Sequence, residues 1–595
     1  MRRLTVPLMA TIGGVFFSYQ SVSRLVTYHN RTYDLALYSR QAWGLARLDG
    51  WNPIVDQSFF TSHWSIILLP LGLLGRLCGT VYALLIFQSV ALAATALPLA
   101  RFAQRRGGPV WGAAAAAVFL LYPNTAHVAS YEFHPGNLAV PALAYALDAV
   151  DRRDTRTLGL SALWTLSCRA DLSLALAALA LVAYWLEPSL RRASLRLGVA
   201  SLGYFSFVML VRALAVEPTA ITSADLHFGV WGGSPLGFLL APFTHFDAWL
   251  AHVGSVDRLT YPLRVLAPCL LLPLLRPRYL LVAAPFLAIN LISAFPTTIR
   301  LYSHYLTPAV PALVCATFDG LAAIGSRRQV LVLPSLLVSV AVGSAVAGGA
   351  PWSLDFVRSD YLFDHTSWRY AWLHRAVPDD VSVQAPDALL PHLAERAVVH
   401  RAPPPERGTE FVVLDVRHRL RFIGDESLLR TIEEPHVRAW LARDDYAVVA
   451  ASPVGLVLQR SDSPRASFSK RFFTRPRSAP TVPLTDCLSI HSGALQGTRL
   501  TLILRAHAAC PSDLALRIGS GPRPSHVRLP FDGHFSPAHL RAGDWITSAF
   551  PLPGSLAERV RKRGLRVGVL RASGARPFPR DPVSVSVTMR MSPLP

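Results

Sequence analysis

Lysine is almost absent from this 595-residue chain: only Lys470 and Lys562 occur, although Lys and Arg together number 58 against 37 Asp and Glu. The net charge of +21 therefore comes from arginine, which is spread thinly instead of gathering in runs that bind nucleic acid. Charged residues make up only 16% and hydrophobic residues 52%, which excludes a disordered polycation. A mean hydropathy of +0.34 indicates a membrane protein with many spans and a soluble portion.

Several catalytic motifs are also missing. The chain has no GxxxxGK[ST], HExxH or GxSxG, which disfavours ATP-driven transport, zincin proteases and nucleophile-elbow hydrolases. No glycine-rich dinucleotide fingerprint follows a strand. These gaps leave chemistry at membrane depth as the main source of functional candidates.

Cysteine is scarce as well, and the six cysteines fall into two groups. Four lie in apolar stretches and lack the CxxC spacing of a zinc site: Cys78, Cys168, Cys269 and Cys315. The other two, Cys487 and Cys510, lie 23 residues apart in the polar C-terminal half. They would suit one disulfide if that half lies outside the cytoplasm.

Long apolar runs fill the first 350 residues and predict about eleven membrane helices, since a span needs roughly 20 residues and fewer where neighbours shelter it. The expected helices cover 5–26, 79–100, 110–129, 137–150, 157–168, 172–186, 195–216, 262–275, 279–296, 305–324 and 329–350.

Arginine collects at every second connection, which predicts the orientation because short basic loops stay in the cytoplasm. The N-terminus is expected inside, and the loops at 27–62, 130–136, 217–260 and 297–304 outside. The apolar segment 63–78 then fits an interfacial or re-entrant helix better than a span. The basic loops contain Arg2, Arg3, Arg101, Arg105, Arg106, Arg152, Arg153, Arg156, Arg191, Arg192, Arg196, Arg276, Arg278, Arg327 and Arg328.

After residue 350 the apolar runs shrink to strand length and charges become frequent. We expect an α/β domain over 351–460, a Pro/Ser/Arg-rich linker over 461–484 and an antiparallel β-sandwich over 485–595. An odd number of crossings places all three outside. The fold class is therefore a polytopic α-helical membrane protein with extracytoplasmic α/β and β-rich portions.

Polar side chains in the expected outer loops are the candidate functional residues. Asp34 follows the first span directly, although a helix N-cap would explain it equally well. Asp56 and His63 lie in the same long aromatic loop, where an interfacial structural role is the alternative. Glu132 and His134 share a short loop with a proline and a glycine, which forces an acid and an imidazole to the mouth of the bundle.

Two further groups carry positive charge. Arg169 and Asp171 lie at the outer apex of a helical hairpin, where the arginine could bind a phosphate or the two could form a structural ion pair. Arg300, Tyr302 and His304 precede a late span and could hold a phosphate leaving group at the membrane surface.

These landmarks, in this order, resemble the predicted membrane proteins of domain-of-unknown-function family 2079. The resemblance runs over about residues 10–460, departs mildly at Tyr33, and carries over only Asp171 from the acidic triplet of the family. The matching stretches include YDLALYSRQAW at 33–43, SHWSIILLPLGLL at 62–74, YEFHPGNLAVPALAYAL at 131–147, CRADLSLALAALAL at 168–181, LLRPRYLLVAAPFLAINLIS at 274–293 and VPDDVSVQAPDALLPHLAERAVVH at 377–400.

That family is similar to the C-type (GT-C) glycosyltransferases, multispan enzymes that take a sugar from a polyprenyl phosphate. The resemblance implies that Asp34 is the general base, with Glu132 or Asp171 assisting it or, together with Asp34, holding a divalent metal ion. It implies that Arg169, Arg300 or His304 binds the phosphate, and that the acceptor is a glycan, lipid or protein. The expected location is the bacterial cytoplasmic membrane, with chemistry at its outer face.

A non-catalytic protein remains the alternative: a flippase or transporter of lipid-linked sugars, or a scaffold that displays the outer domain. Transporters often carry internal repeats with broken spans in both halves, and no convincing repeat occurs here. The long aromatic first loop favours an enzyme without excluding transport.

Overall fold

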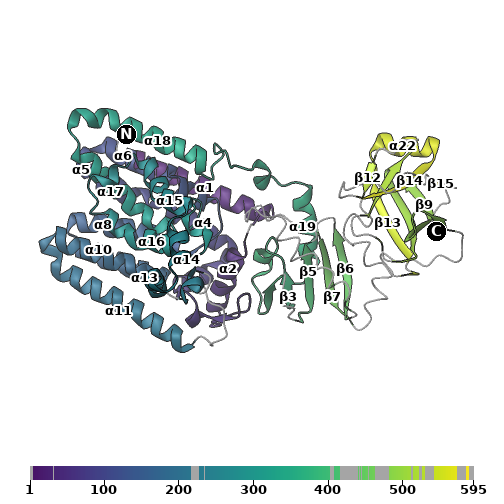
Figure 1. The fold of residues 1–595 in the computed structure, drawn as a ribbon, viewed down its shortest axis with the longest axis horizontal. Coiled ribbons are helices and arrows are strands. Elements are labelled where there is room, and N and C mark those ends of the chain that lie inside the picture. Colours follow the sequence, from purple (N-terminus) through teal and green to yellow (C-terminus); the bar gives the residue numbers. More distant parts are fainter. Residues whose placement is uncertain are drawn as a thin grey trace. The chain divides into compact units, whose positions relative to one another are not determined.

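The computed structural model describes residues 4–30, 32–215, 227–233, 235–402, 408–415, 440, 443, 445–452, 455–461, 481–508, 510, 514–520, 526–528, 542–543, 545–571 and 585–587. The chain divides into two compact units, Met1–Phe363 and Asp364–Pro595 (Figure 1). The first is a helical bundle and the second is rich in strands.

Helices of the first unit pack in antiparallel neighbours around one large apolar core, with α1 against α4, α5 against α6, α8 against α9 and α10 against α11. Proline occupies the first helical position of α6, α7 and α8, where its missing N–H is no loss. The bundle contains α1 (Thr5–Val26), α2 (Asp34–Leu45), α3 (Leu68–Cys78), α4 (Thr80–Ala94), α5 (Ala96–Gly107), α6 (Pro109–Leu121), α7 (Pro123–Ala129), α8 (Pro135–Arg152), α9 (Thr155–Cys168), α10 (Ser173–Leu186), α11 (Arg191–Ala215), α13 (Pro235–Thr244), α14 (Phe246–Val253), α15 (Val256–Leu266), α16 (Leu280–Ile292), α17 (Val310–Ala323) and α18 (Ser326–Ala347).

Three helical stretches of the described chain are long and apolar enough to cross a membrane: Thr80–Gly107, Pro188–Ala215 and Ser326–Ala347. Shorter apolar helices occur at Leu68–Cys78, Pro109–Leu121, Ala170–Leu186, Leu280–Ile292 and Thr307–Ala323. The predicted count of about eleven spans stays a prediction.

Some of the expected helices are broken or displaced. The run expected over 110–129 divides at Tyr122, whose extended backbone precedes Pro123, as proline demands of the residue before it. The helix expected over 262–275 ends at Leu266 and gives way to two 3-10 turns around Leu270 and Leu271, both with left-handed φ. The expected outer loop 217–260 contains α13 and α14, although 216–226 lie outside the described residues.

The second unit begins with α19 (His365–Arg375) and a five-stranded sheet of order β4-β3-β5-β7-β6. Parallel pairing joins β3 to β4 and β5, and antiparallel pairing joins β7 to β5 and β6. The strands are β3 (Val383–Ala385), β4 (Val399–Arg401), β5 (Phe411–Asp415), β6 (Tyr446–Ser452) and β7 (Gly455–Arg460). The acidic helical piece expected after β5 and most of the expected linker lie outside the described residues.

Two four-stranded antiparallel sheets follow, of order β13-β10-β9-β8 and β12-β11-β14-β15. Leucines of both sheets share one core, the arrangement of a β-sandwich. The strands are β8 (Val482–Pro483), β9 (Leu488–Gln496), β10 (Arg499–Ala506), β11 (Leu514–Gly519), β12 (His526–Arg528), β13 (Trp545–Pro551), β14 (Leu565–Arg571) and β15 (Val585–Val587), with α22 (Gly554–Arg563) between β13 and β14.

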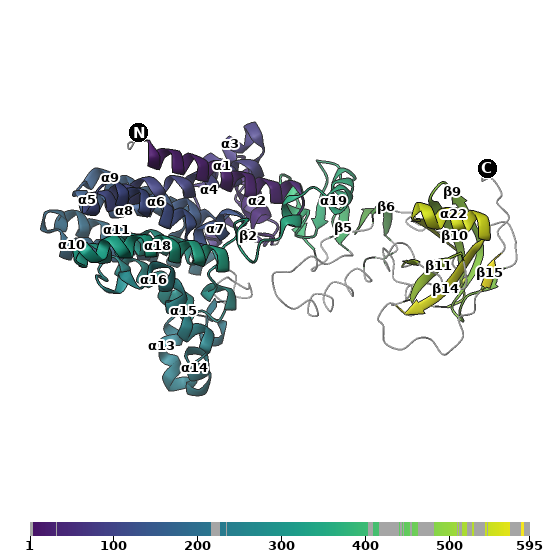
Figure 2. The same cartoon turned by 90° about the horizontal axis from the view of Figure 1, so that it is seen from above.

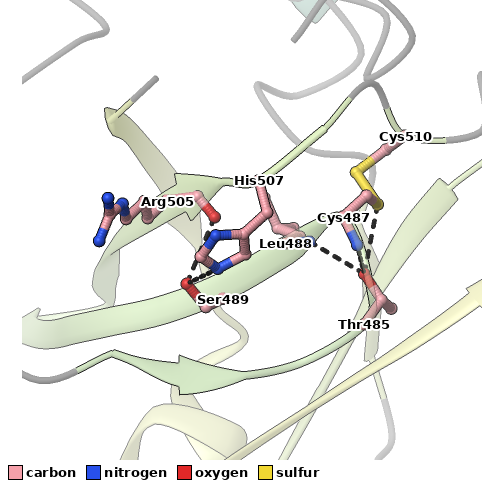
Figure 3. The surroundings of a disulfide bond; sticks show 7 residues. All are labelled: Thr485, Cys487, Leu488, Ser489, Arg505, His507 and Cys510. Atoms are coloured by element: carbon pink, nitrogen blue, oxygen red, sulfur yellow. Dashed lines mark hydrogen bonds between the residues drawn. A yellow bond between two sulfur atoms is a disulfide. The ribbon is translucent and has the colours of Figure 1, made fainter. Parts of the chain in front are cut away.

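A disulfide joins Cys487 to Cys510 beside this core (Figure 3). The Thr485 hydroxyl accepts hydrogen bonds from the backbone N–H of Cys487 and of Leu488, at 3.3 and 3.1 Å, and so fixes the turn that leads into β9. The other four cysteines are free thiols.

Candidate functional site

Three segments far apart in the sequence meet at one end of the bundle: the start of α2, the connection between α7 and α8, and the 3-10 turn Ala170–Leu172. Backbone hydrogen bonds fix the last of these, since Ala170 N–H donates to the His63 carbonyl at 3.2 Å and Ile67 N–H donates to the Ser167 carbonyl at 2.9 Å. The segment 63–67 is thereby held against the turn, so that side chains of both lie close together.

Glu132 fixes the start of α2. Its buried carboxylate accepts hydrogen bonds from Thr32 N–H at 2.5 Å, Thr32 Oγ1 at 2.7 Å and Leu35 N–H at 3.2 Å. The first N–H groups of a helix have no partner within the helix, so carboxyl oxygens at this point satisfy them. Glu132 therefore positions the residue between its two donors, Asp34.

Gln88 of α4 holds the other side of the Glu132 loop. Its Nε2 donates to the Glu132 carbonyl at 3.2 Å, and its Oε1 accepts from His134 N–H at 2.8 Å and from Asn137 Nδ2 at 3.0 Å. All four residues are buried. The loop that carries the acid and the imidazole is thus fixed by a core side chain that the sequence did not single out.

Asp34 is the first residue of α2, and its side chain is 28% exposed. Its Oδ2 accepts a hydrogen bond from Thr32 Oγ1 at 3.0 Å and lies 3.4 Å from His134 Nε2. Two neighbours therefore set the orientation of a carboxylate that still reaches solvent. That combination of fixed direction and access is what a general base needs.

His134 is almost fully buried and stacks on His304, with ring centroids 3.5 Å apart and planes 17° from parallel. Tyr131 stacks on its other side at 6.1 Å, and Tyr38 meets it edge-on at 5.8 Å. Glu132 and His134 come from one loop, and His304 comes from a segment 170 residues later. The structure thus brings together candidates that the sequence could only place on the same side of the membrane.

Arg169 and Asp171 form a bidentate ion pair, with Nε to Oδ1 at 2.9 Å and Nη2 to Oδ2 at 2.8 Å. The sequence left two possibilities open, a phosphate site at Arg169 or an ion pair between Arg169 and Asp171, and the structure forms the ion pair. Nη1 of Arg169 makes no hydrogen bond within the described chain and lies next to Gly136, where an added Cβ would be 3.2 Å from Arg169 Cδ. The glycine therefore leaves room for the guanidinium.

His227 also belongs to the site, although the sequence analysis gave it no role there, and it contacts Tyr305, the residue after His304. His227 Nδ1 lies 2.7 Å from Ser293 Oγ, and its Nε2 lies 3.3 Å from the Tyr305 hydroxyl. The Tyr305 ring contacts the His304 ring at 4.1 Å. His227 lay in a segment expected to be an outer loop, without a motif around it, so no local signal could have found it.

Burial and mutual charge shift the acid–base properties of the group. Withdrawal from water and the neighbouring Asp34 charge raise the pKa of Glu132 to about 7, against the hydrogen bonds from Thr32 and Leu35. Desolvation and the Arg169 charge lower the pKa of His63 to about 3 and that of His227 to about 4. Desolvation and His134 lower the pKa of His304 as well. These three imidazoles are therefore neutral at pH 7.

Three predicted residues lie apart from this group. Arg300 pairs with Asp257 of α15, with Nη2 3.1 Å from Oδ2. Tyr302 contacts the His127 ring at 5.4 Å. Asp56 occupies the turn of the short hairpin between β1 (Trp51–Asn52) and β2 (Gln57–Ser58), with a left-handed φ of 49°.

The metal site expected at Asp34, Glu132 and Asp171 is not formed. Within the described chain, no three His, Cys, Asp or Glu side chains are arranged to hold a metal ion. The oxygens of Glu132 are directed to the N–H groups of α2, and those of Asp171 to Arg169. We therefore derive no step through a metal.

Comparison with solved structures returns GT-C proteins at low similarity. The crystal structure of ArnT from Cupriavidus metallidurans bound to undecaprenyl phosphate is 13% identical, covers 76% of this chain and 97% of its own, and has a TM-score of 0.43. The apo form of ArnT is 11% identical, with 75% and 97% coverage and a TM-score of 0.39. The oligosaccharyltransferase of Archaeoglobus fulgidus in complex with zinc and sulfate is 11% identical, with 74% and 73% coverage and a TM-score of 0.34.

No curated protein sequence matches the chain. The family described as predicted membrane protein (DUF2079) matches residues 24–412, which include the entire site. The resemblance seen in the sequence is thereby confirmed: the chain belongs to this family and is a membrane protein.

Proposed function

We propose that the chain is an integral-membrane glycosyltransferase that moves a sugar from a polyprenyl phosphate to an acceptor hydroxyl at the outer face of a bacterial cytoplasmic membrane. The observation that best supports this is the geometry of Asp34, a partly exposed carboxylate whose direction is fixed by Thr32 and His134. The loop of His134, which stacks on His304, also carries Gly136 beside Arg169, and imidazoles and a guanidinium are groups that can bind a phosphate.

Asp34 acts as general base in this proposal. As the acceptor oxygen bonds to the anomeric carbon, its proton passes to the Asp34 carboxylate, and the bond between the anomeric carbon and the phosphate oxygen breaks. The leaving phosphate keeps the electron pair. A positioned base contributes about 10²- to 10⁴-fold to such a step.

Glu132 is a positioning residue rather than a second base. Its oxygens are directed to the N–H groups that begin α2, and it remains largely protonated below pH 7. A neutral neighbour leaves Asp34 as the carboxylate that holds the negative charge. Glu132 thus keeps the base both oriented and ionised.

Arg169 offsets the charge of the leaving phosphate. Asp171 holds its Nε and Nη2, so the guanidinium plane is fixed before a ligand arrives, and Nη1 remains for a phosphate oxygen. A preorganised cation stabilises developing negative charge without the cost of reorganising at the moment of reaction. His304, whose pKa is lowered by burial, is a neutral donor in the same group.

The test is an assay of membranes that contain the protein against a panel of polyprenyl phosphate sugars. We expect one donor to yield free polyprenyl phosphate and a glycosylated product, and Asp34→Asn to lower that rate by about 10²- to 10⁴-fold. Asp154→Asn is the matched control, because Asp154 caps α9 elsewhere in the bundle and asparagine caps equally well.

Two results would contradict the proposal. Full activity in Asp34→Asn would exclude this residue as the base. Movement of the intact donor across the bilayer, with no polyprenyl phosphate released from any donor, would identify a flippase instead.

A further inference from the structure

The three helices α13, α14 and α15, here called the lateral arm, project from the side of the helical bundle (Figure 2). They lie between the last described turn of α11 and the core helix α16. The arm contributes Phe238 and Ala241 to a small apolar cluster with Trp231, but its outer surface has no comparable cover within the described chain.

That outer surface is an apolar stripe. On α15, Val256, Leu259 and Leu263 follow one another at three- and four-residue steps on one helix face, and Leu259 is 66% exposed. The opposite face of α15, with Tyr261 and Val265, is buried against the bundle. The exposed apolar residues of α15 thus lie opposite its buried face, and Asp257, Thr260 and Arg264 lie along the side between the two.

The other two helices of the arm also expose apolar side chains, which are counted with the stripe. Leu239 is 62% exposed, and Phe243, the most exposed large apolar side chain of the arm, is 87% exposed. Phe246 and Leu250 are exposed on α14. Exposed apolar side chains on three neighbouring helices indicate an interaction site rather than chance exposure.

We propose that the lateral arm lies in the membrane interface, with this stripe in contact with the acyl chains of the leaflet nearest the candidate site. Acyl chains fit the stripe better than a protein partner for a specific reason. The candidate spans α11 and α18 also expose apolar side chains, such as Leu202 and Val338, on the outside of the bundle. In a membrane protein, lipid covers such faces.

Length and polarity place the arm in one leaflet instead of across the bilayer. Its longest helix has 11 residues, which is about 17 Å and well short of the roughly 30 Å hydrocarbon core. Polar residues interrupt the apolar surface where α13 meets α14: Thr244 and His245 are exposed between two phenylalanines, and the exposed Asp247 follows them. An apolar face with a polar edge is typical of helices that lie in the membrane surface.

Hydrogen bonds connect the base of the arm to the site, which identifies the leaflet. Arg258 Nη2 donates to the Ser293 carbonyl at 2.5 Å, and the Ser293 hydroxyl is the partner of His227 Nδ1 at 2.7 Å. His227 in turn contacts the Tyr305 hydroxyl. The arm therefore leaves the bundle at the level of the site. This inference does not depend on the proposed reaction.

Site-directed spin labelling of the full chain in lipid nanodiscs tests the proposal. Cys78→Ser removes the exposed free thiol, and a single cysteine is then introduced as Phe243→Cys, Leu259→Cys or Leu263→Cys. Collision rates of the label with oxygen, which concentrates in lipid, and with a water-soluble nickel complex give its environment. Leu202→Cys on α11 serves as the lipid reference and Glu558→Cys on α22 as the water reference.

We expect the three arm labels to match the Leu202 reference, with oxygen collisions several-fold above nickel collisions. Asp247→Cys, the matched control on the same arm, should show the reverse ratio. Labels that match the Glu558 reference would overturn the proposal and place the arm in water. Labels shielded from both reagents would also overturn it, because a second copy or another part of the chain would then cover the stripe. Three positions are labelled because a substitution that destabilises the protein, seen as a lowered melting temperature, can then be left out of the comparison.

Discussion

The carboxylates near the two ends of α8 have different kinds of partner. At its last turns, Asp148 and Asp151, together with Asp319 of α17, form what we call the arginine network. Each of these carboxylates contacts at least two guanidiniums, at distances such as 2.7 Å from Arg105 to Asp148 and 2.8 Å from Arg106 to Asp151. The arginines are Arg101, Arg105, Arg106, Arg152 and Arg278.

Near the start of α8, the site contains two carboxylates whose partners in the described chain include a hydroxyl, an imidazole and backbone N–H groups. Asp34 has a hydroxyl and an imidazole beside it, and Glu132 accepts from a hydroxyl and two N–H groups. Arg169 pairs with Asp171. Carboxylates that each contact two or more guanidiniums indicate a structural role, whereas an acid with a raised pKa near histidines with lowered pKa values indicates a functional site.

Asp148→Asn should produce the largest effect on stability. It removes the buried partner of three arginines, and breaking a buried ion pair from one side costs about 3–5 kcal/mol of the free energy of unfolding. Chemical denaturation in detergent micelles measures this, with Asp247→Asn, at an exposed position of α14, as the control expected to change little. A loss below about 1 kcal/mol would mean that the arginine network does not stabilise the bundle.

Arg169→Lys should weaken donor binding without unfolding the protein. Lysine cannot reproduce the planar fork that Asp171 holds, so we expect KM for the donor to rise about tenfold with a smaller change in kcat. Arg300→Lys is the matched control, because Arg300 pairs with Asp257 outside the site. An unchanged KM in Arg169→Lys would remove this residue from the phosphate site.

Glu132→Gln should change the pH dependence of stability by a smaller amount. The folded protein keeps the Glu132 proton up to about pH 7, whereas the unfolded chain releases it near 4.5, so this contribution is lost as pH rises toward and through 7. The difference in melting temperature, native minus variant, should fall by about 2 °C or more between about pH 5 and pH 8.

The neutral histidines act in the opposite direction and cancel in that difference. Because the pKa values of His63 and His227 are lowered in the folded state, their contribution is lost as pH falls below 6.5, equally in both proteins. A difference in melting temperature that stays constant with pH would show that Glu132 does not titrate in this range.

Much of the helical part follows from apolar runs and prolines. Thr5–Val26 lies where the sequence places it, because hydrophobic length is a local signal. Helix α8 begins at Pro135, inside the expected loop 130–136, because a proline at the first helical position needs no partner for an N–H group. The left-handed turn at Leu270 and Leu271 has no such signal, since leucine rarely adopts it and only packing can impose it. The sequence did not predict α13 and α14, which lie in the expected outer loop 217–260 and expose many of their apolar residues.

Part of the candidate site could also be predicted from the sequence. Asp34, Glu132, His134, Arg169, Asp171 and His304 were chosen because polar groups at membrane depth are costly. Their grouping depends on tertiary contacts such as the His134–His304 stack, and so do the roles of Gln88 and His227. Arg300 was chosen for the same reason but lies outside the site. Its partner Asp257 is 43 residues away in the sequence, so this ion pair could not be predicted.

One paired measurement tests the central claim that the two ends of α8 divide function from structure. Asp34→Asn and Asp148→Asn are purified side by side, and each is assayed for sugar transfer per folded molecule and for unfolding free energy. We predict that Asp34→Asn loses transfer by about 10²- to 10⁴-fold with near-native stability, and that Asp148→Asn loses stability while its folded fraction stays active. Transfer by Asp34→Asn at the native rate, or loss of transfer only in proportion to stability in both variants, would contradict the account.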